Sequence, residues 1–195
     1  CGTRRSARDR VRCLTFIHIV FMVIHNSDRP GCRHQGFSGR MPTVDLTAVR
    51  DDVLSHCDVL QDRQGPYGAY RMAPRKRTDL YSSLDMALAR VIMGEDFRQS
   101  LSGMQRREWV EHINSFAQAD GTYTDTFGHS ALHANGMVIG ALGPLDGRQL
   151  HPVRLYDAFS DPGDVRPWLE ALDWRRQWSQ SHKFWCGLLC YSMSS

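Results

Sequence analysis

The chain has 195 residues, of which 42% are hydrophobic and 23% are charged, and it carries a formal net charge of +3. This composition is typical of a globular chain with one hydrophobic core and excludes a mainly disordered one. The first forty residues contain eight arginines and two aspartates, a net +6, so the remainder carries −3. A slightly acidic body lacks the clustered Lys and Arg that nucleic-acid binding needs, and we expect no nucleic-acid partner.

Residues 1–40 differ in kind from the rest of the chain. An arginine-rich start precedes an apolar run at 13–24, the order of a secretory signal, but no small-residue cleavage site follows and the run is too short to cross a membrane. Because amphipathic order begins only after Met41, we interpret 1–40 as a non-native or disordered leader and 41–195 as a helical domain. A signal, an anchor or a folded segment are the alternatives. We expect a cytoplasmic protein whose residues 41–195 contact no membrane, or a secreted one if the leader is a genuine signal.

Past Met41, apolar residues recur at spacings of three and four, and sustained runs of alternating β-branched residues are absent. The predicted helices lie at residues 46–60, 79–93, 104–118, 130–142, 165–172 and 174–193. Such a succession of helices predicts an all-α fold built of antiparallel helix hairpins.

Capping residues mark where these helices begin. The predicted caps are Thr43 or Asp45, Thr78, Asp164 and Asp173. The third helix has the strongest signal, because Ser102 and Gln105 have the spacing of a capping box. Gly94 is expected to end the second helix, and Pro144 the fourth.

Cysteines outside the leader are expected to be buried thiols. They are Cys57, Cys186 and Cys190, an odd number that argues against a disulfide framework. Cys186 and Cys190 share a helix face, but no second pair of ligands accompanies them as a zinc site needs.

A tryptophan-containing helix runs into a Gln-x-Asp-Gly turn in the stretch REWVEHINSFAQADGTY. The pattern resembles the repeat of α/α-toroid enzymes, a group that includes terpenoid cyclases, protein prenyltransferase subunits and many α/α-barrel glycoside hydrolases and polysaccharide lyases. The residues that carry the resemblance are Trp109, Gln118, Asp120, Gly121 and Tyr123. It covers about forty residues, in one copy.

The resemblance implies a ring of helix pairs whose active site lies where the loops leading into the inner helices converge. A full ring of twelve helices needs more than about three hundred residues, at roughly eleven or twelve per helix plus loops. This chain has six or seven predicted helices, so we expect part of an α/α toroid, as a fragment of a larger enzyme.

Ionisable groups gather where the third predicted helix passes into the fourth. Asp125 is a candidate general acid or base, with a surface carboxylate as the alternative. His129 and His133 lie four apart on one helix face and are candidate catalytic residues, with capping or buried hydrogen bonding as the alternative. No acidic third ligand stands at the spacing of a His-Glu-x-x-His motif, so we expect no metal and no cofactor.

Four further residues are candidate substrate ligands: Tyr123, Asn135, Trp178 and His182. In the last helix, tryptophans recur at helical spacing as Trp174, Trp178 and Trp185, a pattern typical of a core or of a sugar-stacking groove. Asp120 and Gly121 are expected to form a turn in which the glycine has a positive φ and the aspartate braces it. In the fourth helix, close packing against a neighbouring helix is expected at Gly136, Gly140 and Gly143.

These residues favour an α/α-toroid enzyme fragment that acts on a carbohydrate or uronide by acid–base chemistry, as a glycoside hydrolase or a polysaccharide lyase. Its partner is expected to be a small molecule or an oligosaccharide. One alternative is a non-catalytic helical-repeat interaction domain, in which the polar cluster only caps helices. Another is a terpenoid cyclase-like enzyme, although the aspartate clusters that bind diphosphate are absent.

Overall fold

The computed structural model describes residues 45–123, 128–159 and 161–194. In these ranges the regular structure consists of helices and a few isolated β-bridges, which confirms the predicted all-α class. The α-helices are α2 (Thr47–Leu60), α3 (Leu80–Ile92), α4 (Phe97–Ser100), α5 (Gly103–Asn114), α6 (Ala131–Leu142), α7 (Pro162–Glu170) and α8 (Gln177–Ser194). The 3-10 helices are η1 (Gly143–Leu145), η2 (Arg154–Phe159) and η3 (Trp174–Arg176). Periodicity does not predict α4 or the 3-10 helices, because each is too short to repeat an apolar spacing.

Three of the predicted caps are confirmed. Ser102 and Gln105 form the capping box of α5, with hydrogen bonds of 3.2 Å and 2.8 Å. Asp45 accepts a hydrogen bond from the second amide after it, at the start of α2. Asp173 accepts one from Arg175 N at the start of η3.

Two predicted caps are wrong. At α3 the cap is Asp79 and not Thr78, because the Asp79 carboxylate accepts from Ser82 N at 2.8 Å. At α7 the cap is Asp161 and not Asp164. Pro162 explains the second error, since proline reads as a loop residue but fits the first turn of a helix, which needs no amide donor there.

Helix α2 buries only the second half of its apolar face. Cys57 and Leu60 are buried, whereas Leu46 and Val49 are 58% and 43% exposed. The compact unit Val53–Ser195 begins in the middle of this helix, which agrees with where burial begins.

The main core surrounds Trp109 on α5, whose side chain is fully buried. The rings of Tyr67, Tyr70 and Phe97 lie around it, with centroid distances of 5.8, 5.2 and 5.4 Å. Gly68 lies against the indole with a φ of +90°, and a Cβ there would come within 2.1 Å of the Trp109 ring. Both the backbone conformation and the space therefore require glycine at this position.

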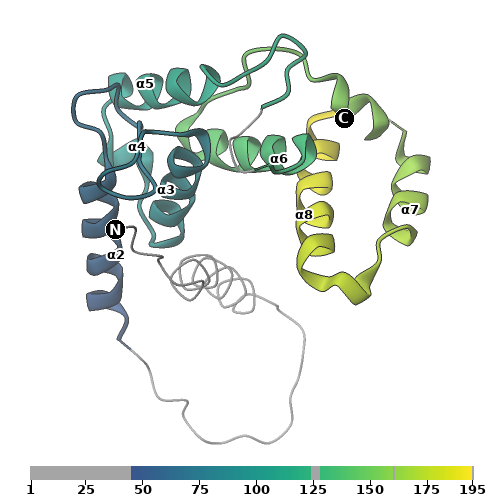
Figure 1. The fold of residues 1–195 in the computed structure, drawn as a ribbon, viewed down its shortest axis with the longest axis horizontal. Coiled ribbons are helices and arrows are strands. Elements are labelled where there is room, and N and C mark those ends of the chain that lie inside the picture. Colours follow the sequence, from purple (N-terminus) through teal and green to yellow (C-terminus); the bar gives the residue numbers. More distant parts are fainter. Residues whose placement is uncertain (1–44, 124–127, 160, 195) are drawn as a thin grey trace, which may run out of the picture. The chain divides into compact units, whose positions relative to one another are not determined.

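Helix α6 lies between α3 and α8 (Figure 1). A Cβ added at Gly136 would lie 2.5 Å from the Cβ of Cys186 on α8, and one at Gly140 would lie 3.6 Å from Leu88 on α3. These two glycines therefore pack closely against neighbouring helices, as predicted. Gly143 does not, because a Cβ there would have no heavy atom within 4 Å.

The three cysteines in the described residues are buried free thiols, which confirms the prediction. Burial raises the pKa of the Cys186 thiol to about 12. Since the thiolate is the reactive form, this cysteine is packed and chemically inert at neutral pH.

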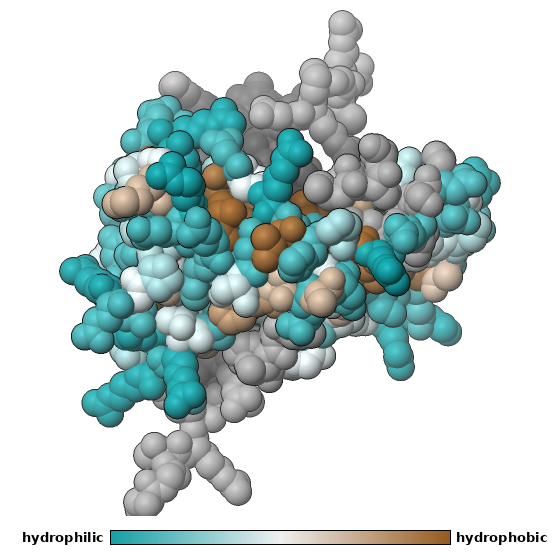
Figure 2. Space-filling model, turned by 90° about the horizontal axis from the view of Figure 1, so that it is seen from above, coloured by the Kyte–Doolittle hydropathy of each residue, from teal (hydrophilic) through white to brown (hydrophobic). Residues whose placement is uncertain are grey.

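Polar residues predominate among the described residues on the face seen in Figure 2. Seen from above, the molecule presents hydrophilic residues over most of this face, with hydrophobic residues in small groups (Figure 2). Among the helices of the described ranges, none has both the length and the hydropathy that crossing a membrane requires.

Candidate functional site

Imidazole and aromatic rings gather where the N-terminal ends of α3, α6 and α8 approach one another. We call this group the histidine cluster, and its members are Tyr81, His129, His133, Trp178 and His182. Its neighbouring ring centroids lie 4.4 to 5.6 Å apart. The structure thus brings together four residues that the sequence predicts for the site, and it adds Tyr81.

Helix starts determine where these side chains meet. Tyr81 is the second residue of α3, His133 the third of α6 and Trp178 the second of α8. Asp79 caps α3, and Ser130 caps α6 by accepting a hydrogen bond from His133 N at 3.3 Å. A cap sets the residue at which its helix begins. These two caps therefore place Tyr81 and His133 in the first turns of α3 and α6, where their side chains meet.

A hydrogen bond joins Tyr81 and His133, whose Oη and Nδ1 atoms are 2.5 Å apart. In one tautomer Nδ1–H donates to the phenol oxygen, and Nε2 carries a lone pair that can accept a proton. In the other tautomer the phenol donates to Nδ1, and Nε2–H is a donor. The pair can therefore move a proton between two groups, as general acid–base catalysis requires.

The remaining rings connect this pair with the surface. Tyr81 is only 6% exposed and belongs to the main core, whereas Trp178 is 51% exposed. His182 lies between them, 5.0 Å from His133 and 4.8 Å from Trp178 by ring centroids. His129 stacks on Tyr81 at 4.4 Å. The proton-transferring pair is thus partly desolvated, while the outer rings are within reach of a ligand.

Tyr123 and Asn135 lie in structural contacts. The Asn135 amide accepts a hydrogen bond from Tyr123 N and donates one to Gly121 O, both at 3.2 Å. The Tyr123 hydroxyl donates to Asn114 Oδ1 at 2.5 Å. Asn135 is fully buried and Tyr123 nearly so. Both side chains hold the turn that precedes α6, and their role in substrate binding stays a prediction.

That turn contains Asp120 and Gly121, as predicted. Gly121 has a φ of +81°, and a Cβ there would lie 2.4 Å from the backbone oxygen of Pro152. Asp120 accepts hydrogen bonds from the hydroxyl and the amide of Thr122, at 2.7 Å and 2.9 Å, and these bonds lower the pKa of the Asp120 carboxyl. The two residues therefore shape the chain between α5 and α6.

Asp125, the third predicted catalytic residue, lies outside the described residues, and its role stays a prediction. Among the residues that are described, no three His, Cys, Asp or Glu side chains are arranged to hold a metal ion.

Asp85 is a carboxyl group near the cluster that the sequence analysis misses. It lies on α3 one turn after Tyr81 and one turn before Leu88, so the three share a helix face. Tyr81 contacts His133 on α6, and Leu88 approaches Gly140 on α6 two turns further along. Burial, together with the negative charge of Asp79, raises the pKa of Asp85 to about 7. An acidic residue beside the apolar stripe of a predicted helix is the sequence signal that points to it.

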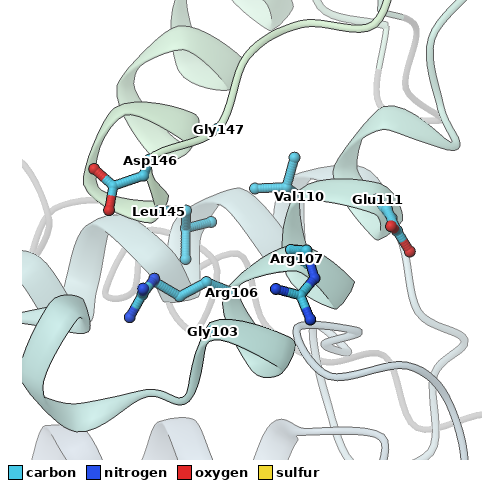
Figure 3. A pocket seen from close by; sticks show the side chains of 8 residues that line it. All are labelled: Gly103, Arg106, Arg107, Val110, Glu111, Leu145, Asp146 and Gly147. Atoms are coloured by element: carbon cyan, nitrogen blue, oxygen red, sulfur yellow. The ribbon is translucent and has the colours of Figure 1, made fainter.

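A hollow of about 260 Å³ lies between α5 and the turn after α6 (Figure 3). Two of its charged residues already have partners. Arg106 donates to the backbone oxygens of Phe97 and Leu101 at 3.1 and 3.0 Å, and Asp146 forms an ion pair with Arg98 at 2.5 Å. These contacts fix α4 and the end of η1, and we assign the hollow a structural role.

The chain matches no protein-family model, and comparisons with curated proteins and with solved structures give no match. The contacts, burial and chemistry of the histidine cluster are therefore what support a function for this chain.

Proposed function

We propose that this chain belongs to an α/α-toroid type of enzyme that acts on a carbohydrate or uronide by acid–base chemistry at the histidine cluster. The observation that carries the proposal is the hydrogen bond between Tyr81 and His133, at the place where three helix N-termini approach one another. A phenol and an imidazole in contact, with exposed aromatic surface close by, form a combination suited to proton transfer on a bound sugar.

The directions of the helices support the toroid part of the proposal. In a succession of antiparallel hairpins, every second helix runs in the same direction. The contacts between α3 and α6 advance along both helices, from Tyr81 with His133 to Leu88 with Gly140, so these two helices run in the same direction. In the chain, the short α4 and the longer α5 lie between them. The resemblance of the α5 region to the toroid repeat implies a site at the loops that lead into such inner helices, and the histidine cluster has that position.

A uronide is the substrate for which the pair can complete a reaction. We start from the tautomer in which Nδ1 of His133 carries the proton and Nε2 does not. Nε2 takes the proton from the carbon next to the uronate carboxyl group, a C=C bond forms, and the C–O bond to the departing sugar breaks. The Tyr81 hydroxyl gives its proton to the departing oxygen, and Nδ1 returns a proton to Tyr81 across their hydrogen bond. The products are an unsaturated uronide and a free sugar hydroxyl, and both side chains end neutral.

The outer members of the cluster have binding roles in this proposal. Trp178 offers an exposed indole face on which a sugar ring can stack, and His182 lies beside it as a hydrogen-bond partner for hydroxyl groups. His129 stacks on Tyr81 and limits the positions that the phenol ring can adopt. Substrate is thereby held on the exposed side of the proton-transferring pair.

The test is turnover of oligouronides by the full chain, measured as the ultraviolet absorbance of the unsaturated product. We expect His133→Gln and Tyr81→Phe to lower kcat at least about 100-fold, the range typical of a lost general acid or base. His56→Gln, an exposed histidine on α2, is the matched control and should keep wild-type turnover. Wild-type turnover by His133→Gln, or a wild-type protein that turns over no uronide, would contradict the proposal. New reducing ends without an unsaturated product would point to hydrolysis instead.

A further inference from the structure

His133 is held at both of its backbone polar atoms as well as at its ring. Its amide donates to the Ser130 hydroxyl at 3.3 Å, and its Nδ1 atom lies 2.5 Å from the Tyr81 hydroxyl. Its carbonyl oxygen accepts a hydrogen bond from the thiol of Cys186 on α8, with 3.6 Å between sulfur and oxygen. The first two contacts come from the cap of α6 and from α3, and the third attaches the same residue to α8.

Helices α6 and α8 approach closely at this point. A Cβ added at Gly136, one turn after His133 on α6, would lie 2.5 Å from the Cβ and 2.7 Å from the sulfur of Cys186. Because Gly136 has no side chain, α8 comes near enough for the Cys186 thiol to reach the His133 carbonyl. The contact therefore requires glycine on α6 and a short side chain with a hydrogen-bond donor on α8.

The same face of α8 also contacts the His133 ring. His182 lies four residues before Cys186, so the two side chains project from one side of the helix. The ring centroids of His182 and His133 are 5.0 Å apart. Helix α8 thus contacts His133 at the ring and at the backbone oxygen, from positions one turn apart. A rotation or a shift of α8 against α6 would break at least one of these contacts.

The Cys186 thiol acts here as a hydrogen-bond donor. Its side chain is fully buried, and burial raises the pKa of the thiol to about 12. The thiol therefore keeps its proton at neutral pH, and the carbonyl oxygen of His133 can only accept. A bond from sulfur to a carbonyl oxygen is weak, so its main effect is on the position of His133 and not on the stability of the fold.

We infer that Cys186 is a positioning residue, which through its bond to the His133 carbonyl holds the imidazole at the distance from Tyr81 at which a proton passes between them. This role rests on the proposed function, since it takes the Tyr81–His133 pair as the place of reaction. Helix α8 would then supply the alignment of the proton-transferring pair as well as the outer rings of the cluster.

Proton NMR of the full chain tests this role without any substrate. A hydrogen bond of 2.5 Å places its proton far downfield, and the resonance is assigned by its loss in Tyr81→Phe. Cys186→Ala should move this resonance upfield or abolish it, whereas Cys186→Ser, which keeps a donor, should retain it. Cys190→Ala is the matched control, because Cys190 is an equally buried thiol one turn further along α8 that packs in a small core with Val153. It should leave the resonance unchanged.

Turnover of oligouronides gives the second measurement. Cys186→Ala should lower kcat at least about tenfold, since a misplacement of ~1 Å costs on the order of 100-fold. KM should change little, because Cys186 does not contact the substrate. Cys186→Ser should recover most of the lost kcat. Cys190→Ala should shift the urea midpoint about as much as Cys186→Ala does and keep the wild-type kcat.

Several outcomes would overturn the inference. They are an unchanged resonance or an unchanged kcat in Cys186→Ala, equal changes in Cys186→Ala and Cys190→Ala, an equal loss in Cys186→Ser and Cys186→Ala, or no downfield resonance in the wild type. The two proposals fail separately. If the wild type turns over no uronide while the resonance responds to Cys186→Ala and not to Cys190→Ala, only the proposed reaction is contradicted. If the wild type turns over uronide and Cys186→Ala matches it in resonance and kcat, only the positioning role is contradicted.

Discussion

Two tryptophan-centred groups of rings in the described residues differ in burial and in the kind of ring that surrounds the tryptophan. The rings around Trp109 include those of the loop before α3, and the tryptophan is fully buried. We call these rings the sealed group. The rings around Trp178 are those of the histidine cluster, at the ends of three helices, and the tryptophan is 51% exposed. We call these rings the open group. In the sealed group the neighbours of the tryptophan are two tyrosines and a phenylalanine, whereas in the open group they are histidines that can exchange protons.

Under the proposed function, aromatic packing stabilises the fold around Trp109 and supports acid–base chemistry around Trp178. The sealed group fills volume so tightly that Gly68 has no room for a Cβ, and its contacts have value only as packing. The open group leaves indole faces and imidazole nitrogens near the surface, where they contribute less to folding. Substitutions in the two groups should therefore have opposite signatures, with stability lost in one and function lost in the other.

The largest expected effect is on the sealed group. Trp109→Ala should lower the free energy of unfolding by about 3–5 kcal/mol, because it removes a fully buried ring and leaves a cavity. Trp178→Ala, the matched change in the open group, should alter it by less than about 1 kcal/mol. Urea unfolding followed by circular dichroism measures both. Equal losses for the two variants would remove the distinction between the groups.

The next effect concerns the contact between α6 and α8 that supports the open group. Gly136→Ala should destabilise by about 1–3 kcal/mol, because its Cβ would lie 2.5 Å from the Cβ of Cys186 and the helices would have to separate. Gly143→Ala is the control, since no atom lies within 4 Å of its Cβ position and alanine favours the helical backbone there. It should be neutral or slightly stabilising in the same unfolding experiment. A Gly136→Ala variant as stable as Gly143→Ala would show that α6 and α8 do not pack this closely.

The last prediction concerns the pH dependence of stability that arises from the carboxyl group of Asp85. Its folded-state pKa of about 7 lies above the ordinary value of 3.8, so the folded protein holds this proton more tightly than the unfolded chain. Stability from this group is therefore greatest at low pH and is lost as the pH rises from about 4 to about 7.

Asp85→Asn removes this dependence and should be more stable than the wild type at pH 8 and equally stable near pH 4. Thermal unfolding across this pH range measures the difference. Asp164→Asn, an exposed carboxylate on α7, is the control for a general change in charge. If the stability curves of Asp85→Asn and the wild type run parallel from pH 4 to pH 8, the Asp85 carboxyl is hydrated and its pKa is not raised.

Local patterns predicted much of the fold. Spacings of three and four located each of the longer helices, and the capping box of Ser102 and Gln105 gave the start of α5 within one residue. The caps at α3 and α7 were missed because two polar residues compete there and only backbone geometry decides between them. Trp109 and Trp178 show the limit of periodicity, since both lie at helical spacings but differ completely in burial. Burial depends on which helices pack together, and single-sequence spacing does not contain that information.

The site was predictable only where its residues are neighbours in the sequence. His129 and His133 share a helix face by spacing alone, and their rings lie 4.8 Å apart. Tyr81 joins them from a position 52 residues away, and His182 approaches from another helix. Asn135, close to the histidines in sequence, is buried and turned to the Gly121 backbone. Sequence proximity therefore gave one half of the cluster, and tertiary packing gave the rest.

We propose that the histidine cluster serves acid–base chemistry and contributes little to folding, and one variant tests this directly. Glutamine at position 133 can keep a hydrogen bond to Tyr81 but cannot transfer a proton. The measurement is the free energy of unfolding of His133→Gln beside its turnover of oligouronides, on one preparation. We predict an unfolding free energy within about 1 kcal/mol of the wild type, the size of one exchanged hydrogen bond, together with the loss of turnover. A variant that unfolds several kcal/mol more easily, or one that keeps full turnover, would contradict the claim.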